Sequence, residues 1–278
     1  MESPTRKSNP GKSLPGESSP GKAEPVGDRW RGLGRLVALP VLDVLRGQRL
    51  CLAAPRDLAW LMVGLLAGWW VYVPLHELLH ALACLATGGT VSRLEVSPLY
   101  GGSLLARFVP WVVSGGEYAG RLSGFDTGGS DLVYLATDLG PFLLTLFPGV
   151  WALRRAARAR RPLAFGAALP LALAPVLSLT GDAYEIASIL TTRLPRWALQ
   201  ASLLRGDDVA VVVSRLRAAT EPPWGGLILA VALGLLWAVA TYGLGAAVAR
   251  ALGQPALDGP GLESDDAAPS QPAPLLPG

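Results

Sequence analysis

The chain is poor in charged residues. Only 16% of its 278 residues are Asp, Glu, Lys or Arg, whereas soluble domains average about 25%. Because 51% of the residues are hydrophobic, this balance argues against an ordinary soluble enzyme and against a wholly disordered chain. The net charge of only +3 is spread along the chain, and nucleic-acid binding needs a concentrated basic face, so we expect no nucleic-acid partner.

Cysteine and histidine are equally scarce, with two residues of each. Cys51 and Cys84 lie far apart in the sequence, which leaves neither a disulfide framework nor a CxxC metal pair. Any metal or catalytic site must therefore be built from two histidines and the few acidic residues that lie in apolar surroundings.

The low charge is concentrated in four long apolar stretches, each about as long as the ~20 residues that a helix needs to cross a bilayer. They predict transmembrane helices at about 58–87, 132–153, 163–192 and 223–249. We therefore expect an all-α polytopic membrane protein with about four transmembrane helices, with the lipid bilayer as its surroundings.

The composition of the remaining chain predicts its division into segments. Residues 1–28 are rich in Pro, Gly and Ser, and residues 254–278 are rich in Pro and acidic residues, so both are expected to be disordered tails. Residues 29–56 mix apolar residues with charges and are expected to lie at the membrane surface. Residues 57–253 then form the membrane domain.

The distribution of Lys and Arg predicts the orientation. With the N-terminus inside and four spans, 16 of the 24 basic residues fall on the cytoplasmic side. Because cytoplasmic loops carry the excess of Lys and Arg, we expect both termini in the cytoplasm. The five arginines between 193 and 221 fall on the other side and weaken this bias.

The segment between the first two predicted spans contains a strand pattern. Thr90–Val96 alternates between polar and apolar residues, Tyr100–Ser103 holds two glycines typical of a turn, and Leu104–Val113 is a second, more apolar run. We interpret this pattern as a small β-hairpin after the first span, at the membrane edge.

Both histidines belong to one motif, His76-Glu77-Leu78-Leu79-His80, at the end of the first predicted span. Positions i and i+4 share one face of a helix, so both imidazoles can reach one metal ion. Glu77 stands beside the first ligand, where a carboxylate can accept a proton from a metal-activated water. The pattern is that of a zinc (Zn²⁺) hydrolase, with His76 and His80 as ligands and Glu77 as general base.

A catalytic zinc takes three protein ligands and a water, and the chain has no third histidine. The third ligand must therefore be acidic or a cysteine. Asp182 is the favoured third ligand. Glu185 is the next candidate, either as the ligand or as a partner that orients a histidine, and Asp138 is a further candidate ligand. Cys84 is ranked last, because one straight helix rarely supplies three tetrahedral ligands.

These motifs resemble the site-2 protease family of intramembrane zinc metalloproteases (peptidase family M50). The HExxH motif continues as His80-Ala81-Leu82 and is followed by Thr87-Gly88-Gly89. Ser97–Gly102 is similar to the membrane-edge hairpin of that family, and Leu139-Gly140-Pro141 is similar to a Gly-Pro in one of its later spans. The resemblance covers residues 58–190.

The resemblance implies an integral membrane enzyme, of a bacterial inner membrane, that hydrolyses peptide bonds of membrane-protein substrates. It also implies zinc ligands at His76 and His80, a general base at Glu77 and an acidic third ligand from a later span. The family's acidic ligand usually precedes a glycine, whereas in Thr180-Gly181-Asp182 the glycine comes first. The alternatives are a non-catalytic membrane protein that keeps the zincin scaffold for binding or regulation, and a transporter.

Overall fold

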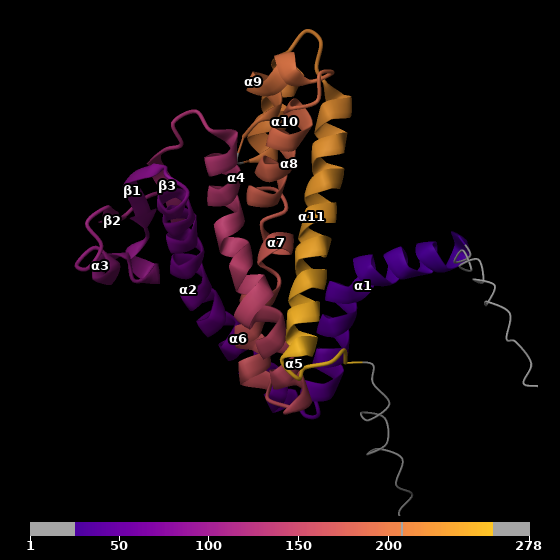
Figure 1. Ribbon diagram of the computed structural model, residues 1–278. Coiled ribbons are helices and arrows are strands. Elements are labelled where there is room, and N and C mark those ends of the chain that lie inside the picture. The colour runs from indigo at the N-terminus through magenta and orange to yellow at the C-terminus, as the bar shows by residue number, and fades with distance from the viewer. Residues whose placement is uncertain (1–25, 207, 258–278) are drawn as a thin grey trace, which may run out of the picture.

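The computed structural model describes residues 26–206 and 208–257, and these residues are mostly helical. The helices form an elongated bundle with a small sheet beside the C-terminal end of α2 (Figure 1). The helices are α1 (Val26–Cys51), α2 (Pro55–Ala86), α3 (Gly102–Leu105), α4 (Asp131–Leu139), α5 (Val150–Arg158), α6 (Pro162–Ala172), α7 (Ala174–Leu177), α8 (Asp182–Thr192), α9 (Ala201–Leu204), α10 (Val209–Ala218) and α11 (Trp224–Ala251).

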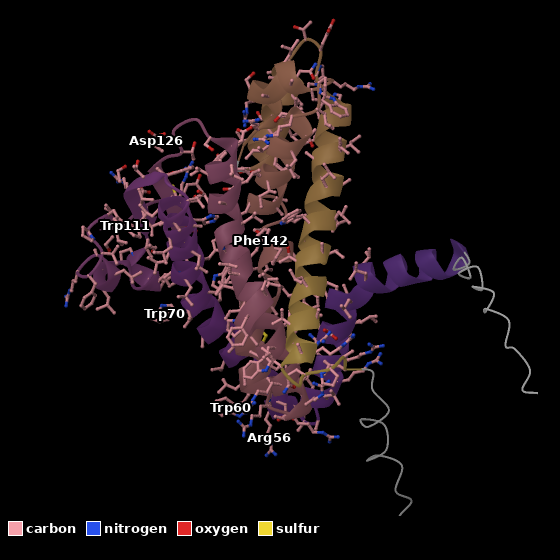
Figure 2. All side chains as sticks on the ribbon, in the orientation of Figure 1. Arg56, Trp60, Trp70, Trp111, Asp126 and Phe142 are labelled. Carbon is pink, nitrogen blue, oxygen red and sulfur yellow. The ribbon has the colours of Figure 1, made fainter. Side chains whose placement is uncertain are left out.

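Three helical segments in the described residues are long and apolar enough to cross a membrane: Pro55–Ala86, Asp131–Arg158 and Trp224–Ala251. Apolar side chains point outward from them, such as Leu66 with 67% and Ile228 with 69% of its surface exposed. A bundle with an apolar exterior is consistent with a membrane protein. Figure 2 shows Arg56 and Trp60 at one end of this bundle and Asp126 toward the other.

Two of the predicted spans are interrupted. The predicted span 132–153 contains a 3-10 turn at Gly140–Phe142 and a π-helical turn at Thr145–Gly149 between α4 and α5. The predicted span 163–192 is divided into α6, α7 and α8, so it is not one long helix and the count of four spans is not confirmed. Prolines, which lack the N–H that continues a helix, accompany these interruptions.

Glycines bring α2 and α6 into close contact. A Cβ atom built on Gly64 would lie 2.0 Å from the carbonyl oxygen of Leu163, and one on Gly68 would lie 2.3 Å from that of Ala167. Gly166 of α6 approaches the carbonyl oxygen of Leu61 in the same way, at 2.1 Å. The two helix backbones can therefore touch only because these positions carry no side chain.

A buried ion pair ties α1 to the bundle. Asp43 of α1 and Arg154 of α5 are both fully buried, and Arg154 Nε and Nη2 each lie 2.8 Å from Asp43 Oδ2. The hydroxyl of Tyr242 on α11 donates to the same oxygen at 3.0 Å. The later part of the predicted surface segment 29–56 thus packs against α5 and α11. Cys51 packs in the core, and burial raises the pKa of its thiol to about 11.

The sheet differs from the predicted hairpin. Strand β1 (Thr90–Val96) forms as expected, but its antiparallel partner is β3 (Gly120–Asp126). The prediction of a second hairpin strand at Leu104–Val113 was wrong, because that segment contains α3 and leads into β2 (Val112–Ser114), which pairs parallel to β1. The chain turns into a helix at Gly102, and this crossover brings it back in the parallel direction.

The predicted disordered tails lie mostly outside the described residues. Where described, they differ from the prediction: Val26–Asp28 begins α1, and residues 254–257 pack against α5. Arg158 donates hydrogen bonds to Gln254 and to the carbonyl oxygen of Ala256, and Leu257 is buried. The packed domain therefore extends to Leu257.

Replacing Gly64 by valine should force α2 away from α6 and lower the unfolding temperature in detergent. Overpacking of this kind costs about 1–3 kcal/mol. Gly34→Val is the matched control, because a Cβ at Gly34 meets nothing within 4 Å. Equal unfolding temperatures for the Gly64 variant and the wild type would contradict the close contact of the two helices.

Replacing Arg154 by methionine should destabilise the protein strongly, because Asp43 would remain buried without its cation. The expected cost is about 3–5 kcal/mol, and replacing the whole pair by apolar residues should recover most of it. The measurement is a double-variant cycle of unfolding free energies with Arg154→Met, Asp43→Leu and both together. Additive single effects would show that the two side chains are not coupled.

Candidate metal centre

The two histidines of α2 meet on the inward face of the helix. His76 and His80 are buried, with 9% and 8% of their surface exposed, and their Nε2 atoms lie 3.1 Å apart. This confirms the expectation that the i, i+4 spacing directs both imidazoles to one point. Helix α2 continues without interruption through Pro74 and ends before Gly88, whose φ of +95° ends the helix.

Asp182 is the acidic residue that the fold brings to this point. Its Oδ2 lies 3.1 Å from His76 Nε2 and its Oδ1 lies 3.5 Å from His80 Nε2. The chain leaves helical geometry at Gly181, with φ −112° and ψ −114°, and α8 begins at Asp182. The break between α7 and α8 therefore places this carboxylate at a helix start inside the bundle, opposite α2.

The spacing of these three side chains fits a metal ion. In the described residues, His76, His80 and Asp182 form a group whose ligand atoms all lie within 4.8 Å of one another. Ligand atoms at about 2.0–2.1 Å from a tetrahedral zinc are about 3.3 Å apart. The observed separations of 3.1, 3.1 and 3.5 Å lie close to that value.

The hydrogen bonds around the histidines also fit a metal ligand set. His80 Nδ1 lies 2.9 Å from the carbonyl oxygen of Thr137, which can only accept, so Nδ1 carries the proton and neutral His80 presents a lone pair on Nε2. His76 Nδ1 lies 2.9 Å from the hydroxyl of Tyr72. Asp182 Oδ2 is buried and accepts no hydrogen bond in the described part of the chain. These acceptor atoms converge on one point that a cation would fill.

The carbonyl of Thr137 accepts from the N–H of Gly140 and keeps its second lone pair for His80, because the residue four positions later is a proline. Pro141 has no N–H, so it cannot supply the ordinary helical donor to this carbonyl. Gly140 supports the same contact, since a Cβ there would lie 2.4 Å from the carbonyl oxygen of Leu79 on α2. The Gly-Pro pair thus lets α4 approach α2 and offer a carbonyl to a histidine.

Glu77 lies beside the metal group and contacts β3. Its carboxylate lies beside the Leu122 backbone, and a Cβ on Gly120 would lie 2.4 Å from Glu77 Cγ. Glu77 is not a member of the ligand group. The start of β3 therefore holds this carboxylate in place at the wall of the cavity described next.

A cavity of about 610 Å³ opens beside the three ligands. Its wall combines the metal group with residues from β3, α4, α8 and the start of α10. It is lined by His76, Glu77, His80, Tyr118, Gly120, Arg121, Leu122, Phe125, Tyr134, Thr137, Asp138, Thr180, Gly181, Asp182, Glu185, Asp208 and Val211.

The other candidate ligands lie near the cavity but outside the ligand group. Glu185 is buried one turn after Asp182 and accepts a hydrogen bond from the hydroxyl of Tyr134 on α4. Asp138 is buried on α4 and also lines the cavity. The Sγ of Cys84 is directed instead to the carbonyl oxygen of Thr90, at 3.7 Å.

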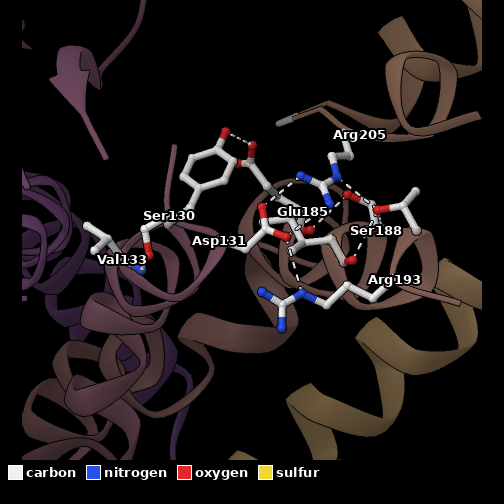
Figure 3. Close-up of polar contacts among 10 residues, drawn as sticks. Ser130, Asp131, Val133, Glu185, Ser188, Arg193 and Arg205 are labelled. Carbon is white, nitrogen blue, oxygen red and sulfur yellow. Dashed lines mark hydrogen bonds and ion pairs between the residues drawn. The ribbon is translucent and has the colours of Figure 1, made fainter. Parts of the chain in front are cut away.

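Ion pairs fix the relative positions of α4 and α8. Asp131, at the start of α4, lies 3.1 Å from Arg193 Nε just after α8 and 2.8 Å from Arg205 Nη1 just after α9 (Figure 3). Arg205 Nε also donates to Thr192 Oγ1 at the end of α8. Because α4 holds His80 through Thr137 and α8 carries Asp182, this cluster helps to keep the two halves of the site in register.

Comparison with protein-family models, with curated proteins and with solved structures found no match to this chain. The interpretation of the site therefore depends on its own geometry.

The sequence reasoning did not identify Tyr72, Thr137, Gly120 or Leu122 as part of the site. Tyr72 could have been found, since it stands four residues before His76 and so shares its helix face. The contacts of β3 with Glu77 could not have been found from the sequence, because nothing in a strand with two glycines indicates which side chain it will contact. The acidic residues were recognised, but only the break before α8 distinguishes Asp182 from Glu185.

We expect purified protein to bind about one zinc ion, and His76→Ala, His80→Ala and Asp182→Ala each to abolish binding, because a tetrahedral site with an open position needs all three ligands. Glu185→Gln and Asp138→Asn are the matched controls and should keep the metal. Metal analysis after exhaustive dialysis makes the measurement. Loss of zinc in Glu185→Gln but not in Asp182→Ala would identify Glu185, and not Asp182, as the third ligand.

Proposed function

We propose that this protein is an intramembrane zinc metalloendopeptidase of the site-2 protease kind. The observation that supports the proposal best is the joint presence of a His-His-Asp ligand group, a glutamate beside it and a cavity open to both. The first histidine, the glutamate and the second histidine stand in the HExxH order of zinc peptidases. Asp182 completes the set of three protein ligands that a catalytic zinc takes.

Each residue of the site then has a role. His76, His80 and Asp182 hold the ion, and zinc bound there would make a water acidic enough to attack at neutral pH and would polarise a peptide carbonyl. Glu77 accepts the proton of the attacking water and delivers it to the leaving amide nitrogen. The Leu122 backbone and the close contact with Gly120 hold Glu77 where it can do so.

The substrate that fits this setting is a membrane-associated protein. The site lies among helices whose outer surface is apolar, so a substrate can approach from the bilayer. The peptide bond must leave helical geometry before its carbonyl can enter the cavity, since a helix keeps its carbonyls hydrogen-bonded. We further propose four crossings of a bacterial inner membrane with cytoplasmic termini, in agreement with the distribution of Lys and Arg.

Replacing Glu77 by glutamine should abolish proteolysis while the protein keeps its zinc. The expected loss in rate is about 10²–10⁴-fold, the usual contribution of a general base. Membranes from cells that carry either the wild type or Glu77→Gln are compared for new protein termini within membrane segments of endogenous proteins. Glu221→Gln, an exposed glutamate outside the cavity, serves as the control that keeps both zinc and activity.

Identical sets of protein termini in the two membranes, with zinc present in both proteins, would contradict the peptidase and favour a non-catalytic role for the same metal site. Metal uptake into vesicles containing the purified protein would favour a transporter instead.

A further inference from the structure

The hydroxyl of Tyr72 is the one side-chain partner of a ligand histidine that the proposed reaction does not use, among the contacts described. It lies 2.9 Å from His76 Nδ1, on the ring edge away from Asp182 and His80. Tyr72 stands one helical turn before His76 on α2 and is 5% exposed. Its ring lies with its centroid 5.1 Å from that of His76.

The two ligand histidines are held in different ways. A main-chain carbonyl holds His80, and because a carbonyl only accepts, it permits only the tautomer that leaves Nε2 free. A hydroxyl holds His76, and a hydroxyl both donates and accepts. Tyr72 can therefore accept from Nδ1–H when His76 Nε2 binds a cation, and can still keep the ring in the same orientation when Nδ1 is unprotonated.

Without this contact, His76 would have a competing arrangement. Its Nε2 lies 3.1 Å from Asp182 Oδ2 and 3.1 Å from His80 Nε2, so a proton on Nε2 would find an acceptor at once. That tautomer blocks the nitrogen that must bind the metal. A partner for Nδ1–H on the far side of the ring favours the tautomer in which Nε2 is free.

We propose that Tyr72 is the positioning residue of this site: its hydroxyl orients His76 for metal binding, as the Thr137 carbonyl orients His80. The inference rests on the proposed metal centre and assigns it a residue outside the HExxH motif. Removal of an orienting partner of this kind usually weakens metal binding by about 10- to 100-fold.

Phenylalanine at position 72 removes the hydroxyl and keeps the ring. The ring packs in a cluster with Val73, Leu144 and Ala174, all of which are buried, so the substitution should leave the packing of α2 intact. Tyr242→Phe is the matched control: it also removes a buried tyrosine hydroxyl, but one that donates to Asp43, outside the metal cavity.

The test measures zinc affinity of the full-length protein in detergent by competition with a chromophoric chelator, and the visible absorption spectrum of the Co²⁺-loaded protein. We expect Tyr72→Phe to bind zinc about 10- to 100-fold more weakly and to change the cobalt spectrum, because an unheld imidazole distorts the coordination. Tyr242→Phe should match the wild type in both. Unfolding temperatures of the metal-free proteins show that the variants are folded, and Tyr72→Leu repeats the test should Tyr72→Phe not fold.

A Tyr72→Phe protein with wild-type zinc affinity and cobalt spectrum would overturn this role for Tyr72 and leave the metal centre standing. An equal loss in Tyr242→Phe would also overturn it, since the effect would then be a general one on the fold. A wild-type protein that binds neither zinc nor cobalt would instead overturn the proposed function itself.

Discussion

The convergence of three electron-pair acceptors on one buried point is the constraint around which this fold is arranged. Two imidazole nitrogens and a carboxylate meet within 3.1–3.5 Å inside an apolar bundle. At this separation such groups repel one another, and low polarity strengthens the repulsion. A proton on one of these atoms, or a metal ion between them, would remove this repulsion.

The irregular backbone of the bundle serves this site. Helix α4 ends near Gly140 and Pro141, where the Thr137 carbonyl accepts from the Gly140 N–H and also contacts His80. Helix α8 begins at Asp182 after the non-helical Gly181. Broken helices leave polar backbone groups without partners, which lipid cannot satisfy. Their position against α2 and α11, within the bundle, is the kind of place where a membrane protein can keep them.

The sequence predicted the elements of this structure better than their connections. The apolar runs located α2 and α11 closely, since a long helix with an apolar exterior follows from composition alone. The interruption of residues 163–192 was missed, although Pro170 and Pro175 lie within it, because hydropathy averages over such breaks. The parallel strand β2 was missed because alternation reveals a strand and not its partner. HExxH identified three site residues, but helix periodicity alone could not separate Asp182 from Glu185, which stand three residues apart on one face.

A contrast between Asp43 and Asp182 bears on the proposed metal site. Asp43 is buried together with Arg154, so the chain itself supplies the balancing charge, and Tyr242 adds a hydrogen bond. Asp182 instead lies 3.1 and 3.5 Å from two imidazoles, and a neutral imidazole balances no charge. Removing a carboxylate from water without a partner is costly, and the side chain of Asp182, which is 18% exposed, reaches this point through a break in the helix. In the metal centre that we propose, a divalent ion would supply the positive charge that Arg154 supplies to Asp43.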